Sequence, residues 1–258
     1  MMAGIHFLIT RFNIRFAEGK EVSESWTRHR WELFQQYCLP SIEQQTCRDF
    51  HWLLYISPNT PKPILKELEH TASRCAMLRI VPIADDVAMK AHWKQTVQTE
   101  SQGVDWVATS RLDSDDALAL DFIASVQAYG PTAKRWVINY NKGLTLLHQE
   151  QPFVYQINAP ANPYISLVEP VSHNIETIVG KDHQQWLKDP NYKEFDTDHP
   201  MWLQIIHQKN VINEVAGTPI KYNHFPKQFG IPNPNYTDNY WLKSTSKKLF
   251  RSLKNRLK

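Results

Sequence analysis

Cysteine is scarce in this sequence, and none of it lies in a metal-binding or disulfide pattern. The 258 residues include three cysteines, Cys38, Cys47 and Cys75, with no CxxC pair and no Cys/His spacing of the kind found in zinc sites. An odd number of thiols without such spacing is typical of a protein from a reducing compartment. The pattern excludes a disulfide scaffold and a structural zinc site, and it predicts structural thiols.

Long apolar runs are missing as well. No run reaches the roughly 18 residues needed to cross a bilayer. The first residues, MMAGIHFLITRF, have neither the charged start nor the long apolar stretch of a secretion signal. The net charge of +3 is too small to indicate nucleic-acid binding. These features predict a cytoplasmic globular protein that does not bind nucleic acid.

The first half of the chain alternates strand-like and helix-like segments. Apolar β-rich runs lie at 5–10, 50–57, 77–83 and 104–110, and segments with helical spacing lie at 28–45, 62–73, 86–101 and 118–129. Pro40 is expected to kink or divide the first helix. Four strand–helix units predict a doubly wound, mostly parallel α/β sheet with helices on both faces. Ligands of such sheets bind at the carboxyl ends of the strands.

The second half of the chain is less regular. We expect a β pair of residues 135–140 and 143–148 around Asn141-Lys142-Gly143, and a further strand at 152–157. An irregular or edge segment is expected at 158–170, a helix at 198–209 and a proline-rich loop at 218–240. No linker separates two domains, so residues 1–240 are predicted to form one domain followed by a tail at 241–258.

Three carboxylates stand within four residues directly after the fourth predicted strand, in the segment RLDSDD. Carboxylates favour a hard divalent cation such as Mn²⁺ or Mg²⁺, which can bridge protein and a nucleotide diphosphate. Alternate residues of an extended segment point the same way, so Asp113 and Asp115 can both face such a metal and the ribose. The alternative is that the acids begin a helix. That alternative explains one or two of the aspartates, but neither a third nor the adjacent Arg111.

The same segment resembles the DxD motif of GT-A glycosyltransferases, and its form is closest to glycosyltransferase family 2. Together, FLITRFNIRF, LPSIEQQTCRDFHWLLYISPNTP, SRLDSDDAL and PMWLQIIHQKNVIN resemble the bacterial rhamnosyltransferase family over about residues 5–225. The resemblance implies a GT-A-like fold with a nucleotide-binding half (1–130) and an acceptor-binding half (131–240). It also implies metal-dependent, inverting transfer of a sugar such as rhamnose from a nucleotide diphosphate donor to a glycan or lipid-linked acceptor.

The resemblance also implies which residues meet the donor. The nucleotide would lie at the end of the first strand, beside Thr10, Arg11 and Asn13, of which Asn13 matches the family 2 pattern. After the third strand, Asp85 and Asp86 either contact the base or ribose or begin the next helix.

Further residues are candidates for the diphosphate and its metal. Arg11 and Arg111 could bind the diphosphate through charge-assisted hydrogen bonds, and Arg111 is the better placed of the two. GT-A enzymes often recruit a late histidine as an additional metal or phosphate ligand, which makes His207 and His224 candidates, with His224 preferred. For either histidine the alternative is a structural or surface position.

The resemblance places a catalytic base at Asp198. The segment TDHPMWLQ has the shape of the Glu-Asp helix start of inverting GT-A enzymes, although Thr197 and Gln204 replace the usual Glu and Arg. A carboxylate there could accept the proton of the acceptor hydroxyl. The alternative is an N-cap aspartate.

The C-terminal segment 242–258 is basic and amphipathic. It contains seven Lys or Arg and no acid, and its leucines and Phe250 fall largely on one helical stripe. Such a helix can lie on an anionic membrane surface beside a lipid-linked acceptor. The alternatives are a solvated tail or a helix packed on its own domain.

Two other functions remain open at this point. A nucleotidyltransferase would share the sheet and the carboxylates, but residues 10–19 contain one glycine and no Gly-rich loop. A non-catalytic glycosyltransferase-like binding protein is the other alternative.

Overall fold

The structure is a computed structural model that describes residues 2–15, 19, 22–132, 134–148, 153–207, 217–220 and 225–232. The predicted basic tail and His224 lie outside these ranges. Within them, no helix is long and apolar enough to cross a membrane.

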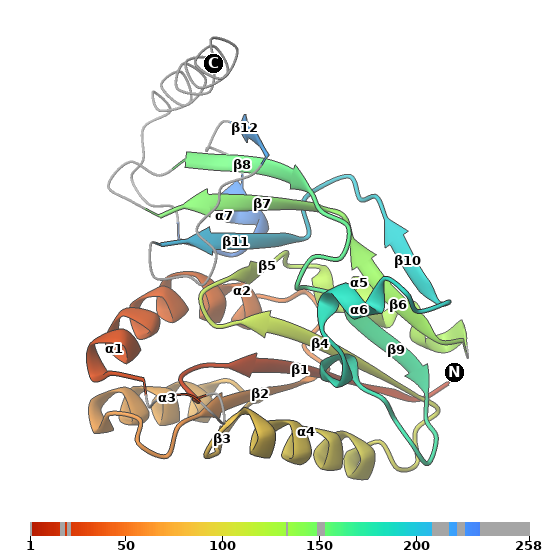
Figure 1. Cartoon of the computed structure of the whole chain (residues 1–258), viewed down its shortest axis with the longest axis horizontal. Coiled ribbons are helices and arrows are strands. Elements are labelled where there is room, and N and C mark those ends of the chain that lie inside the picture. The colour runs from red at the N-terminus through yellow and green to blue at the C-terminus, as the bar shows by residue number, and fades with distance from the viewer. Residues whose placement is uncertain are drawn as a thin grey trace.

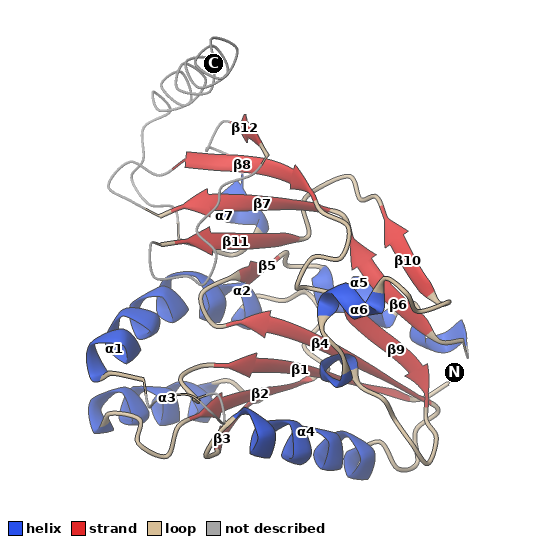
Figure 2. Cartoon of the chain, viewed as in Figure 1, coloured by secondary structure: helices blue, strands red, loops and turns tan. Residues whose placement is uncertain are grey.

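A seven-stranded sheet forms the main layer, in the order β10-β6-β9-β4-β1-β2-β3 (Figures 1 and 2). Its strands are β1 (Gly4–Arg11), β2 (His51–Ile56), β3 (Leu78–Pro82), β4 (Trp106–Asp113), β6 (Trp136–Tyr140), β9 (Ser166–Pro170) and β10 (Tyr192–Phe195). All of them run in one direction except β9. The predicted mostly parallel sheet is therefore confirmed.

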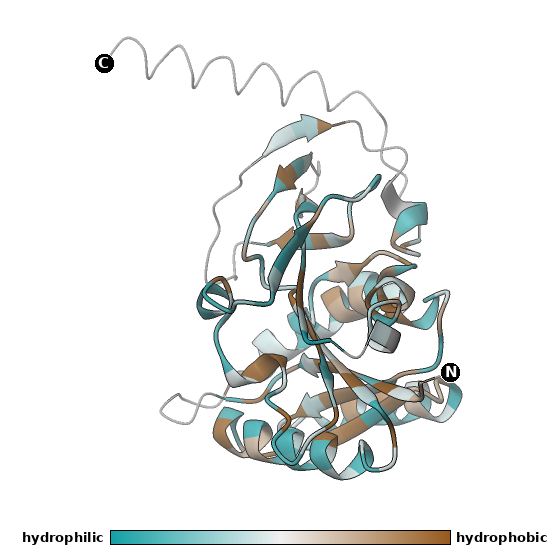
Figure 3. Ribbon diagram, turned by 90° about the vertical axis from the view of Figure 1, so that its right-hand side faces the viewer, coloured by the Kyte–Doolittle hydropathy of each residue, from teal (hydrophilic) through white to brown (hydrophobic). Residues whose placement is uncertain are grey.

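Helices cover both faces of this sheet because successive side chains of a strand point to opposite sides. On one face, Leu8 packs into a core shared with α1 (Glu24–Leu33), a π-helical turn (Phe34–Cys38), α2 (Leu39–Glu43) and α3 (Lys62–Arg74). On the other face, Phe7 packs with Trp93 of α4 (Asp86–Glu100). Figure 3 shows apolar and polar residues alternating along the helices that flank this sheet. The sheet is thus doubly wound, as predicted.

The first predicted helix is divided, as Pro40 led us to expect. Pro40 lies in the first turn of α2, directly after the π-helical turn. Proline has no N–H to donate to the preceding turn, so a continuous α-helix cannot pass through this position undisturbed.

A second sheet has five strands in the order β12-β8-β7-β11-β5. Its strands are β5 (Ala117–Leu118), β7 (Lys142–Leu147), β8 (Phe153–Asn158), β11 (Trp202–Ile206) and β12 (Thr218–Ile220). The Trp202 ring of β11 stacks on Tyr164, with 4.9 Å between ring centroids, and its Nε1 donates to the Tyr140 carbonyl at the end of β6. These contacts join the two sheets into one core.

Two predictions about β structure are wrong. The strands expected to pair around Asn141 belong to different sheets, because Asn141 alone separates β6 from β7 and one residue is too short for a hairpin turn. The segment 158–170 contains an interior strand, since β9 lies between β4 and β6. Its prolines stand before the strand and at its last residue, where they interrupt no pairing.

Two predicted helices are also wrong, wholly or in part. The segment 198–209 contains β11, a strand between β5 and β7 that is buried at both ends. Pairing on both edges outweighs the local helical spacing there. The helix expected at 118–129 is α5 (Phe122–Gln127), because the preceding residues of β5 pair with β11. The loop predicted at 218–240 is also wrong in part, because its described residues include β12 and a short helix, α7 (Phe225–Gln228).

Candidate functional site

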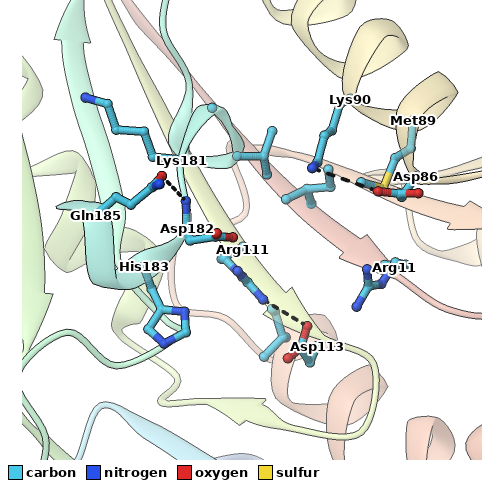
Figure 4. A pocket seen from close by; sticks show the side chains of 14 residues that line it. Arg11, Asp86, Met89, Lys90, Arg111, Asp113, Lys181, Asp182, His183 and Gln185 are labelled. Carbon is cyan, nitrogen blue, oxygen red and sulfur yellow. Dashed lines mark hydrogen bonds and ion pairs between the residues drawn. The ribbon is translucent and has the colours of Figure 1, made fainter. Parts of the chain in front are cut away.

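A cleft of about 610 Å³ lies at the carboxyl ends of β1 and β4, on the face covered by α4 (Figure 4). In the register of these neighbouring strands, Ile9 is opposite Arg111 and Arg11 is opposite Asp113. All four side chains line the cleft. The sheet therefore brings together two segments that lie about a hundred residues apart in the sequence.

The lining of the cleft is rich in charge. It contains four cationic side chains and three carboxylates, namely Arg11, Lys90, Arg111 and Lys181 with Asp86, Asp113 and Asp182. Arg111 Nη2 lies 3.4 Å from Asp113 Oδ1. Burial lowers the pKa of the Arg11 guanidinium, Asp113 counteracts this effect, and Arg111 adds to the lowering. Two guanidinium groups that line the same cleft suit an anionic ligand.

The wall opposite α4 is formed by a loop that the sequence did not indicate as functional. It runs from the 3-10 turn η3 (Ile178–Gly180) into α6 (His183–Trp186). The Trp186 indole is buried and donates to the Ile178 carbonyl at 3.0 Å, which ties the two ends of the loop together. Both residues pack against Val137 of β6 and Leu167 of β9, and these apolar contacts hold the loop on the sheet. The Asp182 backbone N–H donates to the Gln185 side chain at 3.1 Å, and this capping box begins the helix. The D-x-x-Q pattern signals a helix start, but not its position beside the cleft.

Two side chains of this loop, Lys181 and His183, add to the chemistry of the cleft. Lys181 Nζ lies 2.7 Å from a Glu176 carboxylate oxygen. Burial lowers the pKa of His183, and the charge of Arg111 adds to this effect against the carboxylates of Asp182 and Asp113. A histidine with a lowered pKa is neutral at pH 7 and can accept a proton.

Asp115 does not line the cleft and is buried. One carboxylate oxygen forms an ion pair with Arg30 of α1, and the other lies 2.8 Å from His207 Nε2. His207 Nδ1 lies 3.2 Å from His29 Nε2. Burial opposes ionisation of Asp115, but the His207 hydrogen bond and the Arg30 charge outweigh it and lower the pKa of Asp115. The structure thus brings His207, a predicted candidate, to the acidic motif.

Asp116 joins the motif to the rest of the core. Its carboxylate accepts hydrogen bonds from the Tyr164 hydroxyl and the Ile205 backbone N–H, each at 2.7 Å. Burial and the charges of Asp115 and Asp113 raise the pKa of Asp116 well above its usual range. The motif does not cap a helix, because β5 follows it and α5 begins only at Phe122. The helix-start alternative for these acids is therefore wrong.

The described residues offer two adjacent ligands for a divalent cation, Asp115 and His207, but not a complete set. They contain no group of three His, Cys, Asp or Glu side chains close enough to hold a metal by themselves. Asp115 and His207 offer an oxygen and a nitrogen 2.8 Å apart, and Asp113 reaches the neighbouring cleft. Mg²⁺ is commonly held by one or two carboxylates together with substrate phosphates and water. For Asp115 and His207 to hold a cation, Arg30 would have to leave one Asp115 oxygen, and the hydrogen bond between the other oxygen and His207 would have to break.

The side chains of three predicted nucleotide-binding residues form structural hydrogen bonds outside the cleft. Thr10 is fully buried on the opposite face of β1, where its hydroxyl accepts from Trp52 Nε1 at 2.9 Å. Asn13 is buried and hydrogen-bonded to the turn before α3. Asp85 is the N-cap of α4 and accepts from the Ala88 backbone N–H. None of the three lines the cleft, whereas Asp86, the neighbour of Asp85, does.

Asp198 lies in an exposed bend before β11. The helix that the prediction placed there is absent, since Trp202–Ile206 is a strand. His207, which contacts Asp115, follows the other end of the same strand. Asp198 does not line the cleft. This placement separates the predicted base from the residues that meet at β1 and β4.

The sequence matches one protein family. The family described as "Putative rhamnosyl transferase" matches residues 16–219. None of the curated proteins matches.

Solved structures with some likeness include S. aureus TarS 1-349, at 10% identity and a TM-score of 0.47 over 78% of this chain and 60% of that one. The same protein in complex with UDP-GlcNAc has 9% identity and a TM-score of 0.49 over 92% of this chain and 69% of that one. The chain thus spans 60% of the first of these structures.

Proposed function

This chain belongs to the rhamnosyl transferase family, and we propose that it transfers a sugar from a nucleotide diphosphate donor to a hydroxyl of a glycan or lipid-linked acceptor. The observation that carries this proposal is the cleft at the carboxyl ends of β1 and β4, where four cationic side chains and Asp113 face one space. Ligands of doubly wound sheets bind at this edge.

The charged side chains of the cleft suit both the phosphates and the ribose of a nucleotide diphosphate. Arg11 and Arg111 leave neighbouring strands on the same face, so their guanidinium groups can bind phosphate oxygens together. Asp113 is 40% exposed beside them and can accept hydrogen bonds from ribose hydroxyls. Positive charge at this place stabilises the diphosphate as it leaves.

A divalent cation, Mn²⁺ or Mg²⁺, is part of the proposal. Asp115 and His207 would hold it, with Asp113 next to them, and His224 remains a predicted ligand outside the described residues. When bound, the cation supplies positive charge to the diphosphate. Arg30 occupies one Asp115 oxygen in this structure and would have to move aside.

The acceptor side is proposed from the sequence alone. Contact of the basic segment 242–258 with an anionic membrane would bring the enzyme to a lipid-linked acceptor.

A nucleotide screen by thermal shift tests the proposal. UDP, dTDP, GDP, CMP and ADP are each added with Mn²⁺ or with EDTA to the wild type, Arg111→Ala and Asp113→Ala. The matched control is Arg28→Ala, which removes an arginine exposed on α1. At a hundred times its Kd, a ligand stabilises by about 2.7 kcal/mol, which corresponds to roughly 5–10 °C for a protein of this size.

We expect one nucleotide to stabilise the wild type and Arg28→Ala, and to lose most of this effect in the two cleft variants. EDTA should reduce the stabilisation. No stabilisation of the folded wild type by any nucleotide, or undiminished stabilisation of both cleft variants, would contradict the proposal.

A further inference from the structure

The proposed transfer needs a group that accepts the proton of the attacking hydroxyl, and few side chains of the cleft can do so. Two of the three carboxylates stand next to cations: Asp113 is 3.4 Å from Arg111, and Asp86 is 3.9 Å from Lys90. Both of these carboxylates therefore already have a cationic partner in the protein. The remaining acceptors are Asp182 and His183, both in the loop opposite α4.

His183 differs from its neighbour in burial. The imidazole is half-buried at the first residue of α6, whereas Asp182 is exposed. Figure 4 shows the imidazole on the same side of the cleft as Arg111 and Asp113. In the part of the chain that the structure describes, His183 makes no hydrogen bond or ion pair. A polar ring that lines a binding cleft without a protein partner is available to a ligand.

We propose that His183 is the catalytic base that activates the acceptor hydroxyl, an inference that rests on the proposed function. The hydroxyl proton moves to an imidazole nitrogen as the hydroxyl oxygen bonds to the anomeric carbon of the donor. The bond from that carbon to the phosphate oxygen breaks, and its electron pair leaves with the nucleoside diphosphate. Arg11 and Arg111 stabilise the charge that develops there. A single displacement of this kind inverts the anomeric configuration.

The electrostatic surroundings of His183 favour this role. Burial and Arg111 lower its pKa, while Asp182 and Asp113 act in the opposite direction. The ring is therefore neutral before reaction, and the two carboxylates can stabilise the imidazolium that forms. Asp198, which the sequence suggested as the base, does not line the cleft.

The test separates donor binding from turnover. Wild type, His183→Asn, His183→Ala and Asp182→Asn are compared, with His173→Asn as the control because His173 is exposed elsewhere in the same segment of the chain. Nucleotide affinity is measured by calorimetry. Turnover is the release of nucleoside diphosphate from UDP-, dTDP- and GDP-sugars, with alkyl glycosides as acceptors. Circular dichroism establishes that each variant is folded.

We expect both His183 variants to lose about 10²–10⁴-fold in kcat, while nucleotide affinity changes less than about threefold and His173→Asn behaves as the wild type. Added imidazole should restore part of the turnover of His183→Ala, which a merely structural role would not allow. Turnover within threefold of the wild type in His183→Asn, or a large loss in Asp182→Asn alone, overturns the inference and leaves the proposed function intact. A folded wild type that neither binds a nucleotide nor releases one overturns both.

Discussion

Arg30→Ala removes the cationic partner of a buried carboxylate. The Asp115 side chain is 4% exposed and that of Arg30 15% exposed, so the ion pair between them is shielded from water. Removing one partner of a buried pair costs about 3–5 kcal/mol, because the other charge is left without compensation. His207 Nε2, which lies 2.8 Å from the other Asp115 oxygen, remains as a hydrogen-bond partner of the carboxylate. We therefore expect the lower end of the range, about 3 kcal/mol.

The same helix provides a matched control in Arg28→Ala. Arg28 pairs with Glu24, but their side chains are 54% and 61% exposed, and solvent screens such pairs. Exposed ion pairs contribute about 0–1 kcal/mol. Both substitutions remove an arginine from α1 and leave an alanine, which favours a helix. Arg30 also lies over the Trp26 ring, 4.7 Å from its centroid, so the difference in stability reports the loss of the buried ion pair together with this exposed cation–π contact, which contributes about 0.5–1 kcal/mol.

Urea denaturation at pH 7 without divalent cations, followed by tryptophan fluorescence, measures both variants. Arg30→Ala should unfold at a clearly lower urea concentration with an unchanged m-value. If the two variants lie within about 1 kcal/mol of each other, the ion pair of Asp115 is not the buried, stabilising contact described above.

Two further predictions concern the core. Burial lowers the pKa of His6 from 6.5 to about 3. Below pH 6.5, His6 is therefore protonated in the unfolded chain but stays neutral in the folded protein. Stability should fall by about 2 kcal/mol from pH 6.5 to pH 5, and His6→Gln should lack this component in urea denaturation at the two pH values; equal losses would contradict the assignment. A Cβ at Gly143 would lie 2.1 Å from the Trp202 ring, so Gly143→Ala should cost about 1–3 kcal/mol. Gly180→Ala, whose Cβ meets its nearest atom at 3.6 Å, is the control, and equal stability of these two variants would refute this reasoning.

The donor side of the cleft was predicted in part from the sequence. Arg11, Arg111 and Asp113 were named as candidates, and all three line the cleft. They could be found because each stands at the end of an apolar strand, and the carboxyl ends of parallel strands share one edge of the sheet. Thr10 follows the same rule but points to the opposite face, because side chains alternate along a strand.

The opposite wall of the cleft could not be predicted in this way. His183 stands 70 positions after Asp113 in an irregular stretch, and no local pattern connects it to the motif. Its position depends on Trp186, which packs against Val137 and Leu167 of the sheet. Asp115 shows the same dependence, because its environment is set by Arg30 from α1 and by His207 after β11.

The sequence by itself determined the doubly wound sheet and the place of the acidic motif. Both follow from the hydrophobic periodicity of each segment and from the order of strand-like and helix-like segments along the chain. Only the tertiary structure decided that 202–206 is a strand, since pairing with β5 and β7 outweighs local preference. It also decided which aspartate faces the cleft and which is buried among partners. Those outcomes depend on contacts between residues far apart in the chain, and no single segment encodes such contacts.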